Sequence, residues 1–214
     1  MKRFLCLLIL LVPFGLTWAQ GFQQGVHYER VAPADDRDPS APITVEEYFW
    51  YGCSHCYSLE PSVVRWLESK PENVVFVRVP APLNSRWAVH ARAYYVAEVL
   101  GKADEIHQPL FDAMHVERRQ IMSKEDLATF FVEYGISEEE FNKVWDSFAV
   151  QNKMQKALNE ARRYRLTGVP SLVINGEYVT SMATSGGRVF EVVNYLVAEI
   201  NASRSATGAS AATE

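Results

Sequence analysis

The distribution of hydrophobic and polar positions divides the first half of the chain into strand-like and helix-like segments. Ile43–Trp50 and Asn73–Val79 are rich in β-branched and aromatic residues, which is typical of buried strands. Between them, over Ser54–Ser69, apolar residues recur at helical spacing. A further short strand is expected within Gly21–Val31. The pattern therefore predicts a short N-terminal strand and then a strand, a helix and a strand.

A long helical block follows. Arg86–Leu166 shows helical periodicity almost throughout, and Ser123 and Ser137 are placed as N-caps of two of its helices. Glu140 stands three residues after Ser137, which predicts a capping box there. The block is long enough for several packed helices, so we expect an all-helical insertion.

Strand character returns after the helical block. Ser171–Ile174 and Glu177–Thr180 flank Asn175-Gly176, and this dipeptide is the strongest short signal for a β-hairpin. An amphipathic helix over Val189–Ile200 follows. The order of elements predicts an α/β fold in which a central sheet is interrupted by the helical insertion.

The N-terminal segment has the pattern of a secretory signal peptide. Lys2 and Arg3 precede an apolar run over Phe4–Val12, and Thr17-Trp18-Ala19 supplies small residues for cleavage. A membrane anchor is the alternative, but the run is short for a hydrocarbon layer of roughly 30 Å. We therefore expect export, with the mature chain starting near Gln20.

These signals define the expected domain organisation: a signal peptide over 1–19, the first part of an α/β domain over 20–82, the helical insertion over 83–165, the second part of the α/β domain over 166–201, and a disordered tail over 202–214. Loss of Lys2 and Arg3 would change the formal net charge from −5 to −7. An acidic chain without clusters of basic residues argues against a nucleic-acid partner.

The cysteines restrict the function most strongly. The chain has three, and removal of the signal peptide removes Cys6 and leaves Cys53 and Cys56. A disulfide between these two closes a loop of only a few residues, so it would stabilise the fold little. The pair is therefore expected to be redox-active, and no other cofactor is implied.

Cys53-Ser54-His55-Cys56 lies between a predicted strand and the start of a predicted helix. The N-terminus of a helix carries unpaired N–H groups and a positive partial charge, which favours a thiolate on Cys53. Cys56, one turn later, is expected to face inward and act as the resolving thiol. His55 can donate a hydrogen bond or add positive charge, and stabilising the reduced form makes such a centre an oxidant.

Three alternatives apply to these residues. Zinc would require four ligands, and no histidine spacing completes the cysteine pair. An inert dithiol would require that Cys53 be inaccessible. Thr167-Gly168-Val169-Pro170 allows a cis proline at the start of a strand, although a loop proline in the trans form is the commoner case.

Taken together, the dicysteine after a strand, the helical insertion, the Thr-Gly-Val-Pro segment and the Asn-Gly hairpin resemble the DsbA family of bacterial periplasmic disulfide oxidases, especially those of pseudomonad type. The likeness extends over essentially the whole chain after the signal peptide. It implies a thioredoxin-like fold with an inserted all-helical domain. It also implies that newly exported proteins are the substrates and that a DsbB-like quinone oxidoreductase of the membrane reoxidises the pair.

The resemblance assigns roles to individual positions. Cys53 matches the nucleophile, Cys56 the buried partner and His55 the histidine that stabilises the thiolate. Val169-Pro170 matches the cis-proline loop that binds substrate backbone. Glu47 matches a buried acid that manages the proton of the second cysteine, and the alternative is a solvated charge.

Ser54 departs from the family pattern, which most often has proline at this position. Serine restores a backbone N–H and adds a hydroxyl, so the redox potential is the property left open. The leading hypothesis is a monomeric disulfide donor. A reductase or isomerase of DsbC or DsbG type, and a non-catalytic peptide-binding module on the same scaffold, are the alternatives.

Overall fold

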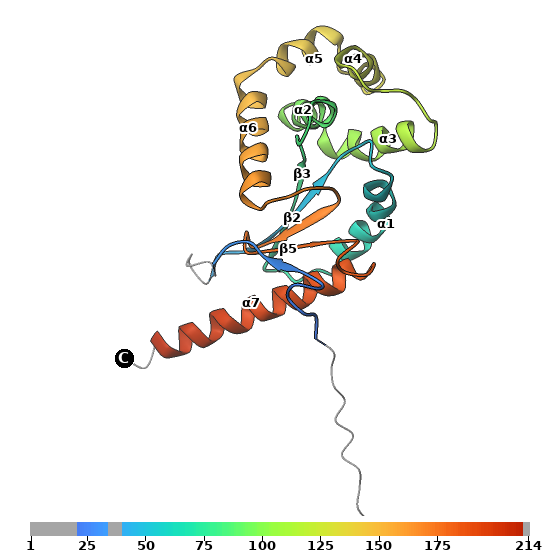
Figure 1. The fold of residues 1–214 in the computed structure, drawn as a ribbon. Helices are drawn as coiled ribbons and strands as arrows, with labels where there is room; N and C mark the ends of the chain where they lie inside the picture. Colours follow the sequence, from blue (N-terminus) through green and yellow to red (C-terminus); the bar gives the residue numbers. More distant parts are fainter. Residues whose placement is uncertain (1–20, 34–39, 212–214) are drawn as a thin grey trace, which may run out of the picture.

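The computed structural model describes residues 21–33 and 40–211 (Figure 1). The predicted signal peptide lies outside the described residues. Within them, no helix combines the length and apolar character that spanning a bilayer requires.

A five-stranded mixed sheet forms the centre of the α/β domain. Its order is β1-β5-β4-β2-β3. The strands are β1 (Glu29–Arg30), β2 (Ile43–Phe49), β3 (Val74–Pro80), β4 (Ser171–Ile174) and β5 (Tyr178–Ser181). Strands β2 and β3 are parallel and are joined through helix α1 (Ser54–Ser69), whereas the other pairs are antiparallel. The predicted strand–helix–strand unit is confirmed.

Five helices stand between β3 and β4 and form the predicted insertion beyond one end of the sheet (Figure 1). They are α2 (Ser85–Val99), α3 (Ala103–His115), α4 (Lys124–Val132), α5 (Glu138–Trp145) and α6 (Phe148–Arg163). Ser123 and Ser137 are N-caps as predicted. The prediction of a capping box at Ser137 is wrong: Ser137 accepts from the Glu140 N–H, but the reciprocal box forms at Ser123, where the Asp126 carboxylate accepts from the Ser123 N–H at 2.9 Å.

The predicted hairpin between β4 and β5 is also present. Asn175 and Gly176 have φ values of 55° and 69°. Positive φ at both residues matches the twist of a tight hairpin turn, and asparagine and glycine tolerate it best. Three residues, 175–177, separate the two strands. The turn sets the register in which Ile174 lies opposite Tyr178.

The last helix is longer than its apolar pattern indicates. Helix α7 (Val189–Ala211) continues beyond Ile200, so the residues from 202 to 211 are helical where the sequence predicts a disordered tail. The Arg204 guanidinium donates a hydrogen bond to the carbonyl oxygen of Ala41 at 2.6 Å. This contact ties the extension of the helix to the segment before β2.

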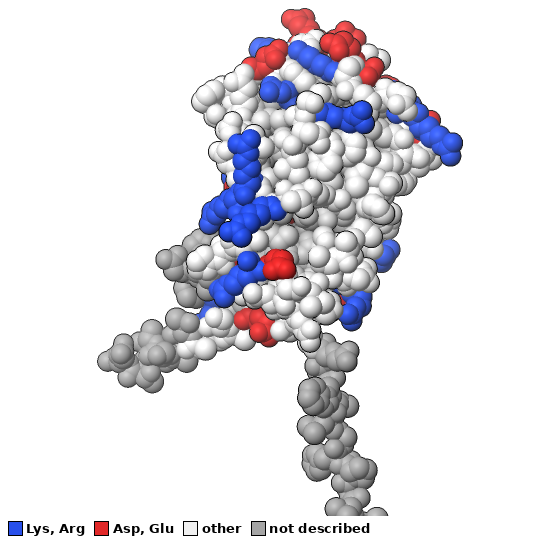
Figure 2. Space-filling model, in the orientation of Figure 1, with Lys and Arg blue, Asp and Glu red and all other residues white. Residues whose placement is uncertain are grey.

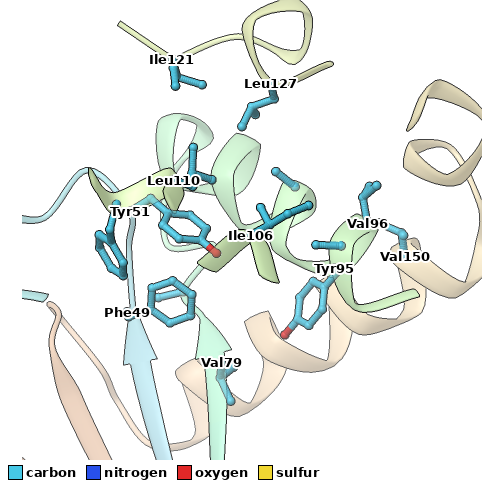
Figure 3. Close-up of a cluster of buried hydrophobic side chains, with 14 of the residues drawn as sticks. Phe49, Tyr51, Val79, Tyr95, Val96, Ile106, Leu110, Ile121, Leu127 and Val150 are labelled. Carbon is cyan, nitrogen blue, oxygen red and sulfur yellow. The ribbon is translucent and has the colours of Figure 1, made fainter. Parts of the chain in front are cut away.

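Two hydrophobic cores hold these elements together. One core lies between the sheet, α1 and α7, and includes Ile43, Val63 and Leu196. The other joins the end of the sheet to the insertion. Figure 3 shows its side chains, where Phe49 and Val79 from the strands share one cluster with Tyr95, Ile106, Leu110, Leu127 and Val150 from the helices. The insertion is thus packed onto the end of the sheet at which β2 leads into α1.

Charged side chains of both signs occupy the surface shown in Figure 2. Lys and Arg side chains gather beside α6, and Asp and Glu side chains gather near α5. Lys153 and Lys156 on α6 form ion pairs with Glu98 and Glu160 at 3.0 and 3.7 Å. The basic side chains beside α6 are therefore partly neutralised.

Candidate active site

The first cysteine stands where β2 ends and α1 begins. Cys53 is the N-cap of α1, and its backbone N–H donates to the carbonyl oxygen of Trp50 at 2.9 Å. Gly52 is required in this turn because a Cβ atom there would lie 2.3 Å from the Trp50 ring. The turn delivers the sulfur of Cys53 to the positive end of the helix.

The environment of Cys53 favours the thiolate. The pKa of Cys53 is lowered from its ordinary value of 9.0 to about 6. The hydrogen bond from the Cys56 thiol is the largest cause, and burial opposes it. Backbone N–H groups of Cys56 and His55 lower the pKa further, and the charge of His55 has the smallest effect. At neutral pH a large fraction of Cys53 is therefore reactive.

Cys56 has the opposite character. Its side chain is fully buried, and the pKa of its thiol is raised by burial, by Cys53 and by the nearby Glu47 carboxyl. Both cysteines are free thiols, so the pair is in its dithiol form. The predicted division between an accessible Cys53 and an inward-facing Cys56 agrees with this geometry.

The Val169–Pro170 segment faces the dicysteine. Its peptide bond is cis, as the sequence analysis allowed. The Cys53 thiol donates to the carbonyl oxygen of Val169 at 3.6 Å. A groove of about 450 Å³ opens beside this contact and is lined by His55, Val169, Pro170 and Met182 among others. A polypeptide bound in the groove would therefore lie next to the reactive sulfur.

Glu47 lies beneath the active site rather than in solvent. It is fully buried on β2, opposite Arg78 of β3, and the Arg78 Nε atom is 3.8 Å from its carboxyl group. Burial and the charge of Glu60 raise the pKa of Glu47 to about 8, although Arg78 opposes the shift. The alternative of a solvated charge at Glu47 is wrong.

Further buried polar residues adjoin Glu47, and none of them was predicted from the sequence. The Arg78 Nη2 atom donates to Glu60 at 2.8 Å, and Glu60 also contacts His107 Nε2 at 3.1 Å. For Glu60 and Arg78, the sequence contains a signal that could have identified them. Glu60 lies on the buried face of α1, three residues before Val63, and Arg78 interrupts the apolar run of β3. A charge at a position that the pattern makes apolar is a reason to expect a function.

Comparisons with known proteins agree with this geometry. Residues 44–197 match the family described as DSBA-like thioredoxin domain. The chain belongs to this family. It is 34% identical over 187 residues to the thiol:disulfide interchange protein DsbA of Pseudomonas aeruginosa, covering 86% of this chain and 89% of that protein. It is 38% identical over 157 residues to the protein of the same name from Azotobacter vinelandii, covering 72% and 73%.

Solved structures show the same fold. The crystal structure of Pseudomonas aeruginosa DsbA superposes with a TM-score of 0.78 at 34% identity, over 89% of this chain and 98% of that one. The oxidoreductase DsbA from Xylella fastidiosa gives a TM-score of 0.76 at 28% identity, over 84% and 98%. The predicted thioredoxin-like fold with a helical insertion is confirmed. So is the predicted activity, which is that of a DsbA-type thiol:disulfide oxidoreductase.

Proposed function

We propose that the chain passes the Cys53–Cys56 disulfide to the thiols of newly exported proteins in the periplasm. The observation that supports this direction of transfer is the low pKa of Cys53. A stabilised thiolate favours the dithiol form of the enzyme, and a couple whose reduced form is favoured oxidises other thiols.

The transfer takes two exchange steps. A substrate thiolate attacks the sulfur of Cys53, the bond between Cys53 and Cys56 breaks, and Cys56 leaves as a thiolate. A second substrate thiolate then attacks the substrate sulfur of the mixed disulfide, and Cys53 leaves as a thiolate. The substrate dithiol becomes a disulfide, and the enzyme disulfide becomes a dithiol.

Each of the other predicted site residues has a part in these steps. Val169 and Pro170 bind the substrate backbone beside Cys53, and His55 contributes to stabilising the departing thiolate. Glu47 supplies a proton to the Cys56 thiolate. This role for Glu47 is supported by its burial, by its raised pKa and by its influence on the pKa of Cys56.

The proposal includes a place and a partner. A DsbB-like quinone oxidoreductase of the membrane reoxidises the dithiol, as the family resemblance implies. The secretory pattern of residues 1–19 supports a periplasmic location.

The test is the equilibrium of the cysteine pair with glutathione buffers, followed by tryptophan fluorescence. We expect a couple more oxidising than glutathione, which would also show that Ser54 is compatible with disulfide donation. A couple clearly more reducing than glutathione would contradict the proposal and indicate a reductase or an isomerase.

A further inference from the structure

Helix α3 of the insertion contacts Tyr51, which lies two residues before the reactive cysteine. It contacts both the side-chain hydroxyl and the backbone carbonyl oxygen of Tyr51. The Tyr51 hydroxyl lies 3.1 Å from His107 Nδ1, and the Tyr51 carbonyl oxygen lies 2.7 Å from His115 Nε2. The two histidines are about two helical turns apart on α3. Tyr51 is only 1% exposed, and its contact with His107 is buried, whereas its contact with His115 is partly buried.

The chemistry of the neighbouring groups fixes where the protons lie. Burial would raise the pKa of Glu60, but His107 and Arg78 lower it overall, so Glu60 is a carboxylate that accepts from His107 Nε2–H. Burial lowers the pKa of His107 and keeps its imidazole neutral, so its Nδ1 accepts from the Tyr51 hydroxyl. A carbonyl oxygen can only accept, so His115 Nε2–H is the donor to Tyr51.

Helix α3 contacts residues that flank the dicysteine in the sequence, Tyr51 before it and Tyr57 after it. Tyr51 lies within the turn in which the Cys53 N–H donates to the Trp50 carbonyl oxygen, so fixing Tyr51 fixes that turn. The His115 ring also stacks on Tyr57, the residue after the second cysteine, with ring centroids 4.9 Å apart and an interplanar angle of 11°.

We propose that His107 and His115, which we call the α3 clamp, are positioning residues of the redox centre. They hold the turn before Cys53 so that its sulfur stays at the N-terminus of α1, within reach of the amides that stabilise the thiolate. This role rests on the proposed function. It makes the docking of the helical insertion a determinant of the oxidising strength of the cysteine pair.

His115→Phe tests the clamp directly. Phenylalanine retains a ring that can stack on Tyr57 but removes the hydrogen bond to the Tyr51 carbonyl. We expect the titration midpoint of Cys53, followed by the ultraviolet absorbance of the thiolate, to rise by about one unit. The equilibrium with glutathione should shift about tenfold toward the oxidised protein, which corresponds to about 30 mV.

Tyr51→Phe provides a second, independent variant. It removes only the hydroxyl that donates to His107 and leaves the carbonyl contact with His115 in place. We expect a shift in the same direction and smaller than that of His115→Phe, because the carbonyl oxygen belongs to the turn itself. His107 is left unchanged, so its hydrogen bond to Glu60 is kept.

Arg92→Met is the matched control. Arg92 Nη1 donates to the carbonyl oxygen of Trp145 at 2.9 Å, so this variant also removes a side-chain donor to a backbone carbonyl within the insertion. We expect it to lower the thermal unfolding temperature while leaving the Cys53 midpoint and the glutathione equilibrium within twofold of wild type.

Two results would overturn the clamp. One is a His115→Phe protein whose Cys53 midpoint and glutathione equilibrium equal those of wild type. The other is an Arg92→Met protein with the same shift as His115→Phe, since general destabilisation would then be the cause. If the wild-type couple is itself more reducing than glutathione, the proposed function fails. In that case, the difference in Cys53 titration midpoint between wild type and His115→Phe still tests whether the α3 clamp stabilises the Cys53 thiolate.

Discussion

The two cores of the molecule differ in what they bury. The core between α1, α7 and the sheet is lined by apolar side chains such as Ile43, Val63 and Leu196. The core beneath the dicysteine joins the sheet to the insertion, and Glu60 and His107 are buried beside its aromatic rings.

The difference indicates that the apolar core mainly stabilises the fold, whereas the core beneath the dicysteine also holds groups suited to chemistry. Burying apolar area stabilises a fold, whereas burying carboxyl and imidazole groups costs free energy unless they are paired. Glu60 and His107 are paired with each other, but the Glu47 carboxyl has only the distant Arg78 Nε at 3.8 Å among the described residues. Such a group is expensive to keep in a core. Its carboxyl group raises the pKa of Cys56, which is in line with the proton transfer proposed for it above.

The largest expected effect comes from Cys53→Ala. This variant removes the sulfur that substrates attack, so oxidation of a reduced test protein should fall to the uncatalysed rate. The measurement is the rate of disulfide formation in a substrate with two cysteines. Far-ultraviolet circular dichroism provides the control, because the apolar core is untouched and the fold should persist. Activity above the uncatalysed rate in a folded Cys53→Ala protein would refute the assignment of the nucleophile.

Leu196→Ala tests the other side of the comparison. Leu196 is 1% exposed within the apolar core on α7. Truncating a buried leucine typically costs about 2–5 kcal/mol of unfolding free energy through lost burial and the cavity left behind. Denaturant unfolding measures this loss. The glutathione equilibrium of the folded protein should stay within twofold of wild type, and a larger shift would show that the two cores are coupled.

Glu47→Gln replaces the titratable carboxyl group of Glu47, beneath the dicysteine, with a neutral amide. The ordinary pKa of a glutamate is near 4.5, and that of Glu47 in the folded protein is about 8. Between these values the unfolded chain has lost the proton that the folded protein keeps, so Glu47 makes stability fall as pH rises from about 5 to 8. The variant should flatten that decline and be about 2 kcal/mol more stable than wild type at pH 8.

Denaturant unfolding of wild type and Glu47→Gln across this pH range measures the difference. The substitution should also slow the step in which Cys56 accepts a proton, and stopped-flow tryptophan fluorescence follows that step. Equal pH dependence of stability in the two proteins would show that Glu47 does not titrate between pH 5 and 8.

The sequence predicts the local elements well because each has a local cause. Asn175-Gly176 determines the hairpin turn, Ser123 and Ser137 cap their helices, and the dicysteine begins α1 at Ser54. Helix α7 is the exception, since the contact of Arg204 with Ala41 joins residues 163 positions apart and no local pattern shows it.

The active site divides in the same way. The roles suggested for Cys53 and Cys56 follow from their places at the helix start, which the sequence shows. The contact between Glu47 and Arg78 depends instead on the register of β2 against β3. The contact between Glu60 and His107 depends on how the insertion packs onto α1. Neither is encoded by the spacing of residues near the dicysteine, so both require the three-dimensional structure.

The smallest expected effect concerns His55, although the sequence alone pointed to this residue as the main reason to expect an oxidant. Its charge is the weakest of the influences that lower the pKa of Cys53, behind the Cys56 thiol and the backbone N–H groups. His55 is exposed, and an exposed charge contributes little because water screens it. His55→Ala should therefore raise the titration midpoint of Cys53 by only about half a unit.

The same titration gives the pH range over which this thiolate matters. With an ordinary pKa of 9.0 and a folded value of about 6, the stabilisation of the reduced form grows from pH 6 to pH 9 and is lost as pH falls through 6. A rise of two units or more in the Cys53 titration midpoint of His55→Ala would show that the imidazole contributes more to stabilising the thiolate than the start of α1 does. The main source of the oxidising strength would then be a side chain beside the groove instead of the Cys56 thiol and the backbone N–H groups at the start of α1, toward which the α3 clamp holds the Cys53 sulfur.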